Sequence, residues 1–296
     1  MTAQDFFIAI TQIALLLFIV TSMLAMGLSL TVPQIIAPLK NARLVILALL
    51  ANFVLVPLLA YLIKAVIPLD QSLQTGLIVL SAGAGAPFLP KLVQGAKGNI
   101  AFGVGLMVLL MVATIIYMPL VLPLLLPGVS VNPWDIAKSL IVLMLVPLAL
   151  GMLLKSHSPE EAAHWQQFMN KISSVAMLIM VVVGLGLNIS NILDLIGSNG
   201  FLALLLFIAG SLVIGFVLGG RDPHVNSVMG LGTAQRNVSA AILVSGMNFA
   251  GTMTLPFVLI AALLFLIILL PTAKRLGMRA SAASAPASTT GGTAAS

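Results

Sequence analysis

The chain has 296 residues, of which 60% are hydrophobic and only 7% are charged, with no cysteine and a net charge of +6. Soluble domains carry roughly 25% charged residues, so this composition predicts an all-α integral membrane protein that crosses the bilayer several times. The basic residues stand at the ends of apolar runs without forming a patch, so we expect no nucleic-acid partner. The absence of cysteine excludes disulfides, thiolate zinc sites and cysteine nucleophiles.

About nine apolar runs follow one another, each long enough for the roughly 20 helical residues that a bilayer requires. They cover residues 6–30, 43–67, 71–94, 99–126, 133–155, 166–194, 200–220, 224–249 and 252–276. The first run exceeds the roughly 7–15 residues of a signal-peptide core and follows no basic segment, so we interpret it as a membrane span. Residues 1–279 then form a single membrane domain. The tail 280–296, rich in Ala, Ser, Thr and Gly, is expected to be disordered.

The charged residues between the runs predict the orientation in the membrane. With the N-terminus outside, the inside set contains Lys40, Arg43, Lys91, Lys97, Lys155, Lys171, Arg221, Lys274, Arg275 and Arg279. The outside set contains Asp5, Asp70, Asp135 and Asp194, with Lys64 and Lys138 nearby. Lys and Arg concentrate on the cytoplasmic side of membrane proteins. We therefore expect an outside N-terminus and a cytoplasmic C-terminus, in the inner membrane of a bacterium.

Two short stretches align without a gap and predict an internal repeat. Residues 27–35 read GLSLTVPQI and residues 184–192 read GLGLNISNI; each ends a span and continues through a short amphipathic segment into a span rich in Leu, Ala and Val. On the predicted topology the first lies inside and the second outside, so the copies are inverted. Repeat 1 then covers about 6–126 and repeat 2 about 166–276, with the span 133–155 as connector.

Spans 3 (71–94) and 8 (224–249) each contain a polar or glycine-rich stretch near the middle. In span 3 it is 81–87, where Gly83 and Gly85 permit unusual dihedral angles and Pro87 suits the first turn of a new helix. From Gln71, about 12 residues reach Gly83, or roughly 18 Å, which is mid-bilayer. In span 8 it is 232–237. Paired broken spans in inverted repeats indicate the substrate site of a secondary transporter, although a kinked close-packing face is an alternative.

Arg236 is the most informative residue, because an ionised group at bilayer depth is costly and usually functional. One interpretation is that its guanidinium binds carbonyl groups freed by the break. The other, which we favour, is that it binds an anionic substrate directly or through water, near helix N-termini that favour negative charge. Thr233, Gln235 and Asn237 offer a hydroxyl and two amides beside it. Lys91 is expected to extend to the inner surface instead.

The chain contains no catalytic constellation. Carboxylates are not paired within a span, and no Gly-x-Ser-x-Gly elbow or phosphate loop is present. We therefore expect neither an enzyme nor a cofactor, and no protein-bound metal.

The broken spans in inverted repeats, the chain length and the run GTAQRNVSAA at 232–241 together resemble the bile acid:sodium symporter family over residues 6–276. The resemblance implies that spans 3 and 8 are discontinuous helices that cross in a mobile core. It also implies that spans 1, 5 and 6 form a panel against which the core moves.

The sequence departs from the sodium-binding pattern that this resemblance implies. Pro87 and Phe88 stand where the family has a Ser-Asn pair after the span 3 break, Gly232 or Thr233 falls near its Glu, and Arg236 replaces its Gln. Thr114 remains from the hydroxyls expected on the following helix. Thr114, Thr233 and Asn237 are thus weak candidates for ion binding, and sodium coupling is doubtful because a guanidinium repels sodium.

The sequence therefore predicts a secondary-active transporter of a small organic anion that works by alternating access, with the anion and the lipid bilayer as partners. The predicted substrate-binding residues are Gly83, Gly85, Pro87, Thr233, Gln235, Arg236 and Asn237. One alternative is a sodium-coupled symporter of bile-acid-like solutes. An alternative of another class is a membrane receptor or scaffold that does not transport.

Overall fold

The computed structural model describes residues 3–36, 40–126, 132–186 and 199–284, and all regular structure in these ranges is helical. The elements are α1 (Ala3–Ser29), α2 (Val32–Ile36), α3 (Ala42–Leu50), η2 (Ala51–Leu55), α4 (Val56–Val66), α5 (Gln71–Ala82), α6 (Leu89–Gly95), α7 (Ile100–Leu125), α8 (Pro133–Leu140), η3 (Ile141–Leu145), α9 (Val146–His157), α10 (Pro159–Gly186), α12 (Asn199–Leu218), α13 (Pro223–Ala234), α14 (Val238–Asn248) and α15 (Thr254–Ser284).

Five helices in the described ranges are long and apolar enough to cross a membrane by themselves: Ala42–Val66, Ile100–Leu125, Pro133–His157, Asn199–Leu218 and Thr254–Ala282. A shorter apolar helix covers Ile13–Ser29. The chain is thus an all-helical, multi-pass membrane protein. The total of nine spans and the inverted repeat stay predictions, because part of the second repeat motif, 187–192, lies outside the described residues.

Most helix boundaries fall within two residues of the predicted ones, but two predictions were wrong. The sixth span was expected to begin near 166 after a polar loop, whereas α10 begins at Pro159, separated from the end of α9 at His157 by Ser158 alone. The Ser158 carbonyl accepts a hydrogen bond from the amide of Ala162 (2.9 Å). The carboxylates of Glu160 and Glu161 lie in the first turn, where they stabilise the positive end of the helix dipole. The tail was expected to lose structure from residue 280, whereas α15 continues to Ser284; residues 285–296 lie outside the described ranges.

Two spans contain a π-helical turn followed by proline. Turn η2 lies between α3 and α4 and precedes Pro57, and turn η3 lies between α8 and α9 and precedes Pro147. Proline has no amide proton, so it leaves a carbonyl of the preceding turn without a helical partner. At η2 the carbonyls of Asn52 and Phe53 accept bonds from outside their own span instead: Arg236, between α13 and α14, donates to Asn52 (3.4 Å), and Tyr117 of α7 donates to Phe53 (2.8 Å).

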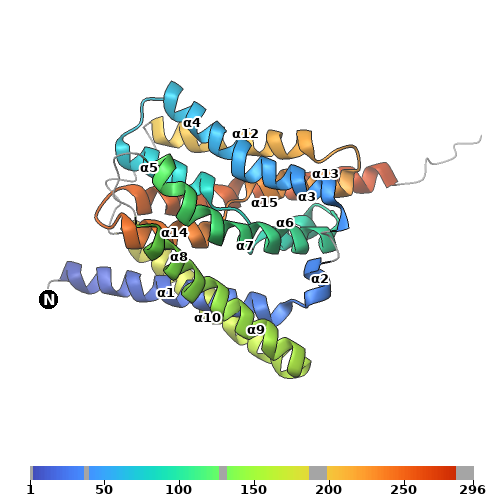
Figure 1. Cartoon of the computed structure of the whole chain (residues 1–296), viewed down its shortest axis with the longest axis horizontal. Helices are drawn as coiled ribbons and strands as arrows, with labels where there is room; N and C mark the ends of the chain where they lie inside the picture. Colours follow the sequence, from blue (N-terminus) through green and yellow to red (C-terminus); the bar gives the residue numbers. More distant parts are fainter. Residues whose placement is uncertain (1–2, 37–39, 127–131, 187–198, 285–296) are drawn as a thin grey trace, which may run out of the picture.

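The helices form two groups that lie side by side (Figure 1). Helices α1, α9 and α10 pack against one another as one group, and the remaining long helices form the other. Helix α8, which continues into α9 through η3, contacts α7 and α14 of the second group. Gly27 of α1 and Gly151 of α9 allow close contact within the first group, because a Cβ at either position would overlap backbone of the other helix. The first group contains predicted spans 1 and 6 and the α9 half of span 5; the resemblance assigns spans 1, 5 and 6 to a panel.

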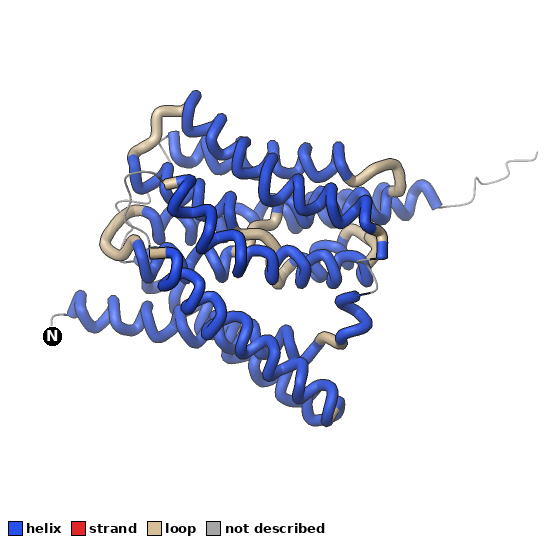
Figure 2. Tube along the Cα trace, in the orientation of Figure 1, coloured by secondary structure: helices blue, strands red, loops and turns tan. Residues whose placement is uncertain are grey.

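Two helices of the second group are interrupted near the middle of the molecule. Figure 2 shows short loop segments at the centre of the bundle, where the chain passes from α5 to α6 and from α13 to α14. The predicted interruptions of spans 3 and 8 are therefore present, at residues 83–88 and 235–237.

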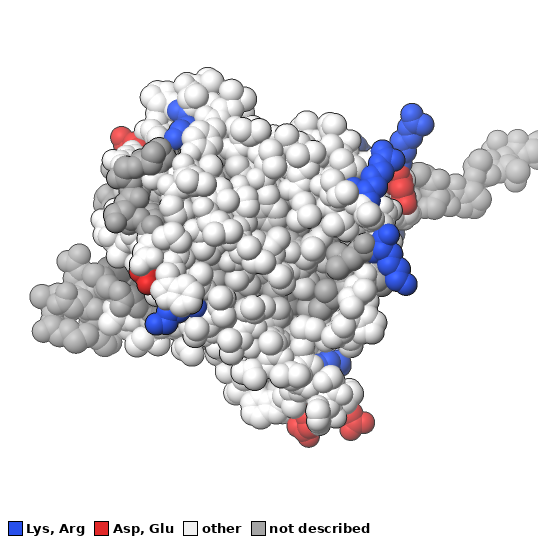
Figure 3. Space-filling model, in the orientation of Figure 1, with Lys and Arg blue, Asp and Glu red and all other residues white. Residues whose placement is uncertain are grey.

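Charged side chains lie at the helix ends. In Figure 3, lysine and arginine concentrate at the right-hand end, where α3 begins and α15 ends, with an acidic residue beside them. Acidic and basic residues both appear at the opposite end and near the turn between α9 and α10. The basic residues at the right-hand end belong to the set predicted to lie inside, and the orientation itself stays a prediction.

A cavity beside two broken helices

The interruption between α5 and α6 is held against α7 by its backbone. Gly85 has a φ of +77°, and a Cβ there would overlap the backbone of Met107 and Met111 on α7. Beside it, the hydroxyl of Thr114 accepts a hydrogen bond from the Ala84 amide (2.8 Å) and donates to the Ala84 carbonyl (3.0 Å). A glycine is needed here for both its dihedral angle and its size. The loop is therefore a specified turn, and the Thr114 hydroxyl is already engaged.

The second interruption contacts the first directly. The amide of Asn237 donates to the carbonyl of Gly83 (3.1 Å), and the Asn237 side-chain oxygen accepts from the Ala240 amide (3.1 Å), which caps the start of α14. A Cβ at Gly83 would lie 3.3 Å from the Asn237 carbonyl. The predicted residues Gly83 and Asn237, 154 positions apart (237 − 83), thus join the two breaks.

Arg236 is completely buried at this junction and donates five hydrogen bonds to protein oxygens. Its Nε binds the Leu80 carbonyl (3.1 Å), and Nη2 binds the carbonyls of Ser81 (2.7 Å) and Asn52 (3.4 Å). Its Nη1 binds the Asn52 side-chain oxygen (2.7 Å) and the Thr233 carbonyl (3.1 Å). A guanidinium has five N–H donors, so every one is used.

This arrangement matches the first of the two interpretations of Arg236, in which it binds carbonyls freed by the breaks. Helix C-terminal carbonyls without amide partners carry partial negative charge. Their hydrogen bonds with the guanidinium offset the desolvation of both the carbonyls and the guanidinium. The direct contact with substrate stays a prediction, and any such contact has to exchange for one of these five bonds. A hydrogen bond to a charged group contributes about 1.5–3 kcal/mol.

Asn52 is a part of this junction that sequence reasoning missed. It is buried in η2, donates to the Ala48 carbonyl (3.0 Å) and reaches the Thr233 hydroxyl (3.5 Å) while its side-chain oxygen accepts from Arg236. An asparagine inside an apolar span is a signal that the sequence contains. The sequence does not identify Arg236 as its partner, because Asn52 and Arg236 are 184 residues apart. The predicted residue Thr233 is engaged by this pair.

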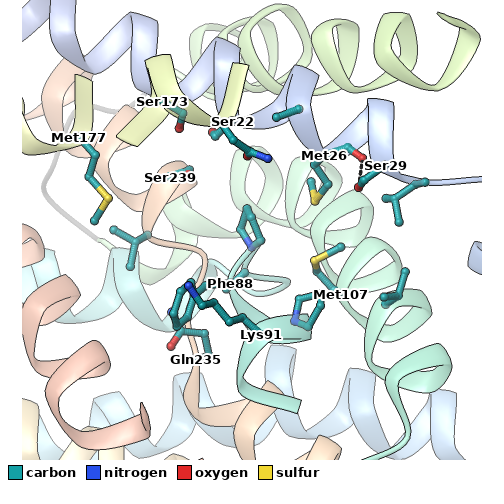
Figure 4. A pocket seen from close by; sticks show the side chains of 18 of the residues that line it. Ser22, Met26, Ser29, Phe88, Lys91, Met107, Ser173, Met177, Gln235 and Ser239 are labelled. Atoms are coloured by element: carbon teal, nitrogen blue, oxygen red, sulfur yellow. Dashed lines mark hydrogen bonds between the residues drawn. The ribbon is translucent and has the colours of Figure 1, made fainter. Parts of the chain in front are cut away.

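A cavity of about 760 Å³ lies between the two groups of helices, next to the junction. Such a volume lies within the roughly 300–1,000 Å³ of small-molecule sites. Its walls come from α1, α2, α6, α7, α10, α14 and α15 and from the two breaks. The lining residues include Ser22, Met26, Ser29, Lys91, Met107, Ser173 and Gln235. Figure 4 shows Ser22 and Ser173 across the cavity from Phe88, Lys91 and Gln235.

The charge inside the cavity is positive. Lys91 and Arg236 are the charged residues among those that line it, so no acidic side chain of the described chain faces them there. Lys91 is exposed, and its ammonium lies 5.6 Å from the centre of the Phe88 ring. The expectation that Lys91 extends to the inner surface is incomplete, because its side chain also borders the cavity. A cation in a largely apolar cavity favours an anionic ligand.

Two amides next to Arg236 contain unpaired polar atoms. Oε1 of Gln235 and Nδ2 of Asn237 are buried and have no hydrogen-bond partner among the described residues. An unsatisfied buried polar group costs about 1–3 kcal/mol, and such groups mark places where a ligand or water binds. Of the predicted substrate-binding residues, Gln235, Arg236 and Pro87 line the cavity, whereas Gly83, Gly85, Thr233 and Asn237 form the junction behind it.

The weakly predicted ion ligands are not arranged around a common point. Thr114 binds Ala84, Asn237 caps α14, and Thr233 contacts Asn52. No group of three or more His, Cys, Asp or Glu side chains that could hold a metal occurs in the described residues. Two unit charges about 4 Å apart repel by about 4 kcal/mol at an effective dielectric constant near 20, so a sodium ion beside the guanidinium is opposed.

Fold and cavity together define a multi-pass helical membrane protein with a cationic cavity beside a pair of broken helices. The chain belongs to the sodium bile acid symporter family: the family model matches residues 14–195, more than half of the sequence. This confirms the family that the sequence resembles. The matched part ends before Arg236, so the residues of the second break lie outside it.

Three relatives are similar to the chain over part of their length. The Arabidopsis thaliana protein described as "Probable sodium/metabolite cotransporter BASS3, chloroplastic" is 25% identical over 195 residues, 66% of this chain and 45% of that protein. The BASS2 and BASS3 proteins of Oryza sativa subsp. japonica, described likewise, are 29% identical over 162 residues and 25% over 184. These matches cover 54% and 62% of this chain and 37% and 43% of the rice proteins. The aligned part is thus less than half of each relative.

Proposed function

We propose that the protein is a secondary transporter of a small organic anion, which it binds in the cavity between the two groups of helices and releases on the other side by alternating access. The observation that carries the proposal is the cavity itself, whose charged lining residues are Lys91 and Arg236, both cationic. Membership of a symporter family supports the transport function.

The chemistry of the walls favours an amphipathic anion. Lys91 and the Gln235 amide offer an ammonium and an amide at one side of the cavity, while Met26, Met107 and the Phe88 ring supply apolar surface. Methionine side chains adapt to ligands of varied shape. A carboxylate with an apolar body fits this combination.

The position of the cavity along the membrane suggests the conformation. Its lining includes the end of α1 and the start of α7, which the predicted orientation places at the cytoplasmic side, together with the middle of α10. The cavity then opens inward, and a second conformation opens it outward. Motion of the group α1, α9 and α10 against the other helices would supply the change, as in other transporters with paired broken helices.

Uptake into proteoliposomes tests the proposal. The purified full-length protein is first screened by thermal stabilisation against a panel of carboxylates with cholate as its largest member. A stabilising anion is then loaded into proteoliposomes, and counterflow of its labelled form is measured. Transport predicts accumulation of label against its gradient until the loaded anion is exhausted. Saturable binding without any counterflow would indicate a receptor or scaffold instead.

The names of the relatives favour one further candidate, a sodium-coupled symporter of metabolites or bile-acid-like solutes. The same proteoliposomes distinguish it, because uptake by a coupled symporter rises when an inward sodium gradient is imposed at constant ionic strength and zero membrane potential. Uptake that is equal with sodium and with choline supports the anion transporter without sodium coupling.

A further inference from the structure

The five acceptors of Arg236 form a cation site at the ends of two half-helices. The carbonyls of Leu80 and Ser81 belong to the last turn of α5, and the Thr233 carbonyl belongs to the last turn of α13. Asn52 adds its side-chain and backbone oxygens from η2. Carbonyl oxygens at the C-terminal ends of broken helices are the groups that coordinate coupling cations in secondary transporters.

The cation in this site is attached to the chain. The acidic residues of the described ranges lie at helix ends, and none of them pairs with Arg236. The guanidinium charge is balanced by carbonyl and amide dipoles alone. Those dipoles would otherwise face one another across the junction and repel, so the cation holds α5, α13 and η2 together.

A free sodium ion, which the names of the relatives imply, does not fit at the same place. All five oxygens already accept guanidinium N–H bonds, and the nearby Thr114 hydroxyl is engaged with Ala84. Repulsion by the guanidinium at about 4 Å would weaken sodium binding on the order of a thousandfold. The residues of this junction therefore disagree with a sodium site.

We propose that the Arg236 guanidinium is a tethered substitute for a coupling cation. It fixes the two broken helices in the conformation that forms the cavity wall, and no free ion is needed for that step. Anion transport through the cavity is then independent of the sodium gradient. The inference rests on the proposed transport function, but its structural part concerns cation binding and is measurable without transport.

Thermal unfolding of the purified full-length protein tests it. The parent protein is measured in NaCl, KCl and choline chloride at equal ionic strength, and its Tm is expected to be the same in all three. Arg236→Ala is expected to unfold at a lower temperature, and low concentrations of methylguanidinium, which occupies the vacated site, should raise its Tm saturably by about 2–4 °C. Arg221→Ala removes an exposed arginine from the α12–α13 connection and is the matched control, with no response to methylguanidinium expected.

A saturable sodium-specific rise in the Tm of the parent would overturn the proposal. So would an Arg236→Ala protein that responds to methylguanidinium no more than Arg221→Ala. Arg236→Lys retains the charge and is the variant to use if the alanine variant does not fold. It should unfold at a lower temperature than the parent, and sodium should not change its Tm. Sodium-specific stabilisation of this variant would contradict the proposal. Because these readouts involve no transport, a failure of counterflow would count against the proposed function alone.

Discussion

Lys91 is the cation of the cavity that is free to meet a ligand. Its side chain is exposed and borders the cavity, whereas the guanidinium of Arg236 uses all its donors within the protein. Lys91→Ala is expected to weaken binding of the transported anion roughly 10- to 100-fold, the effect of losing one charge-assisted hydrogen bond. Competition binding with the stabilising anion measures it.

Lys274→Ala is the control for this change, since it removes an exposed lysine of α15 that does not line the cavity. It should bind the anion as the parent does, and both variants should unfold near the parent's temperature. Equal affinity of Lys91→Ala and the parent would place the anion elsewhere.

Asn52 determines the stability of the junction. Asn52→Ala leaves one N–H of the buried guanidinium without its 2.7 Å acceptor, and removes the bond to the Thr233 hydroxyl. We expect a loss of about 1.5–3 kcal/mol in the free energy of unfolding. Asn248→Ala, which removes a bond to a carbonyl of its own helix, is the comparison and should cost less, about 1 kcal/mol or below. Equal losses in the two variants, measured by unfolding in detergent, would show that the bond to Arg236 adds nothing.

At the scale of elements, the turn between α5 and α6 depends on Gly85. Gly85 and Gly220 have similar φ values, +77° and +79°, but a Cβ at Gly85 would overlap the backbone of α7, whereas nothing lies within 4 Å of a Cβ at Gly220. The two alanine variants thus share the cost of left-handed backbone, about 1–2 kcal/mol, and differ only in the overlap. Gly85→Ala should be strongly destabilised or fail to accumulate, and Gly220→Ala should fold. Similar unfolding temperatures for both would mean that the turn tolerates displacement from α7.

The boundaries of most elements were predictable because local chemistry defines them. Asn99 and Asn237 cap helices, glycine and proline mark the break after Ala82, and lysines and arginines stand at span ends. The start of α10 was also readable, since Ser158, Pro159, Glu160 and Glu161 form a typical helix start, but their polarity was taken as that of a loop. The local signals of a helix start were therefore present in the sequence, and they predict this helix better than the polarity of the segment does.

The candidate site was predictable only in part, because partners distant in the sequence leave no local pattern. Broken helices and the burial of Arg236 followed from composition at mid-span. That five oxygens would satisfy its donors, two of them from Asn52, depends on how α5, α13 and η2 pack. The same limit applies to Lys91, whose place in the cavity depends on α1 and α10 lying opposite.

For the whole molecule, the distribution of charge predicts the orientation. The lysine-rich end shown in Figure 3 should be cytoplasmic, with the N-terminus outside. Two reporters are fused in turn after Ser296, one that works only in the cytoplasm and one that works only outside the cell. The cytoplasmic reporter is expected to be active. Activity of a reporter that works only outside the cell would reverse the orientation and place the opening of the cavity on the outer side.

The central claim is that the cavity is a substrate site open to one side of the membrane at a time. The chain has no cysteine, so Ser22→Cys places a single thiol in the cavity wall contributed by α1. In oriented vesicles, a membrane-impermeant thiol reagent should label this cysteine from the cytoplasmic side in the resting state. It should also label it from the outer side, with rates that shift in opposite directions when the transported anion is added. Labelling from a single side whose rate is unchanged by any anion that binds would contradict alternating access through this cavity.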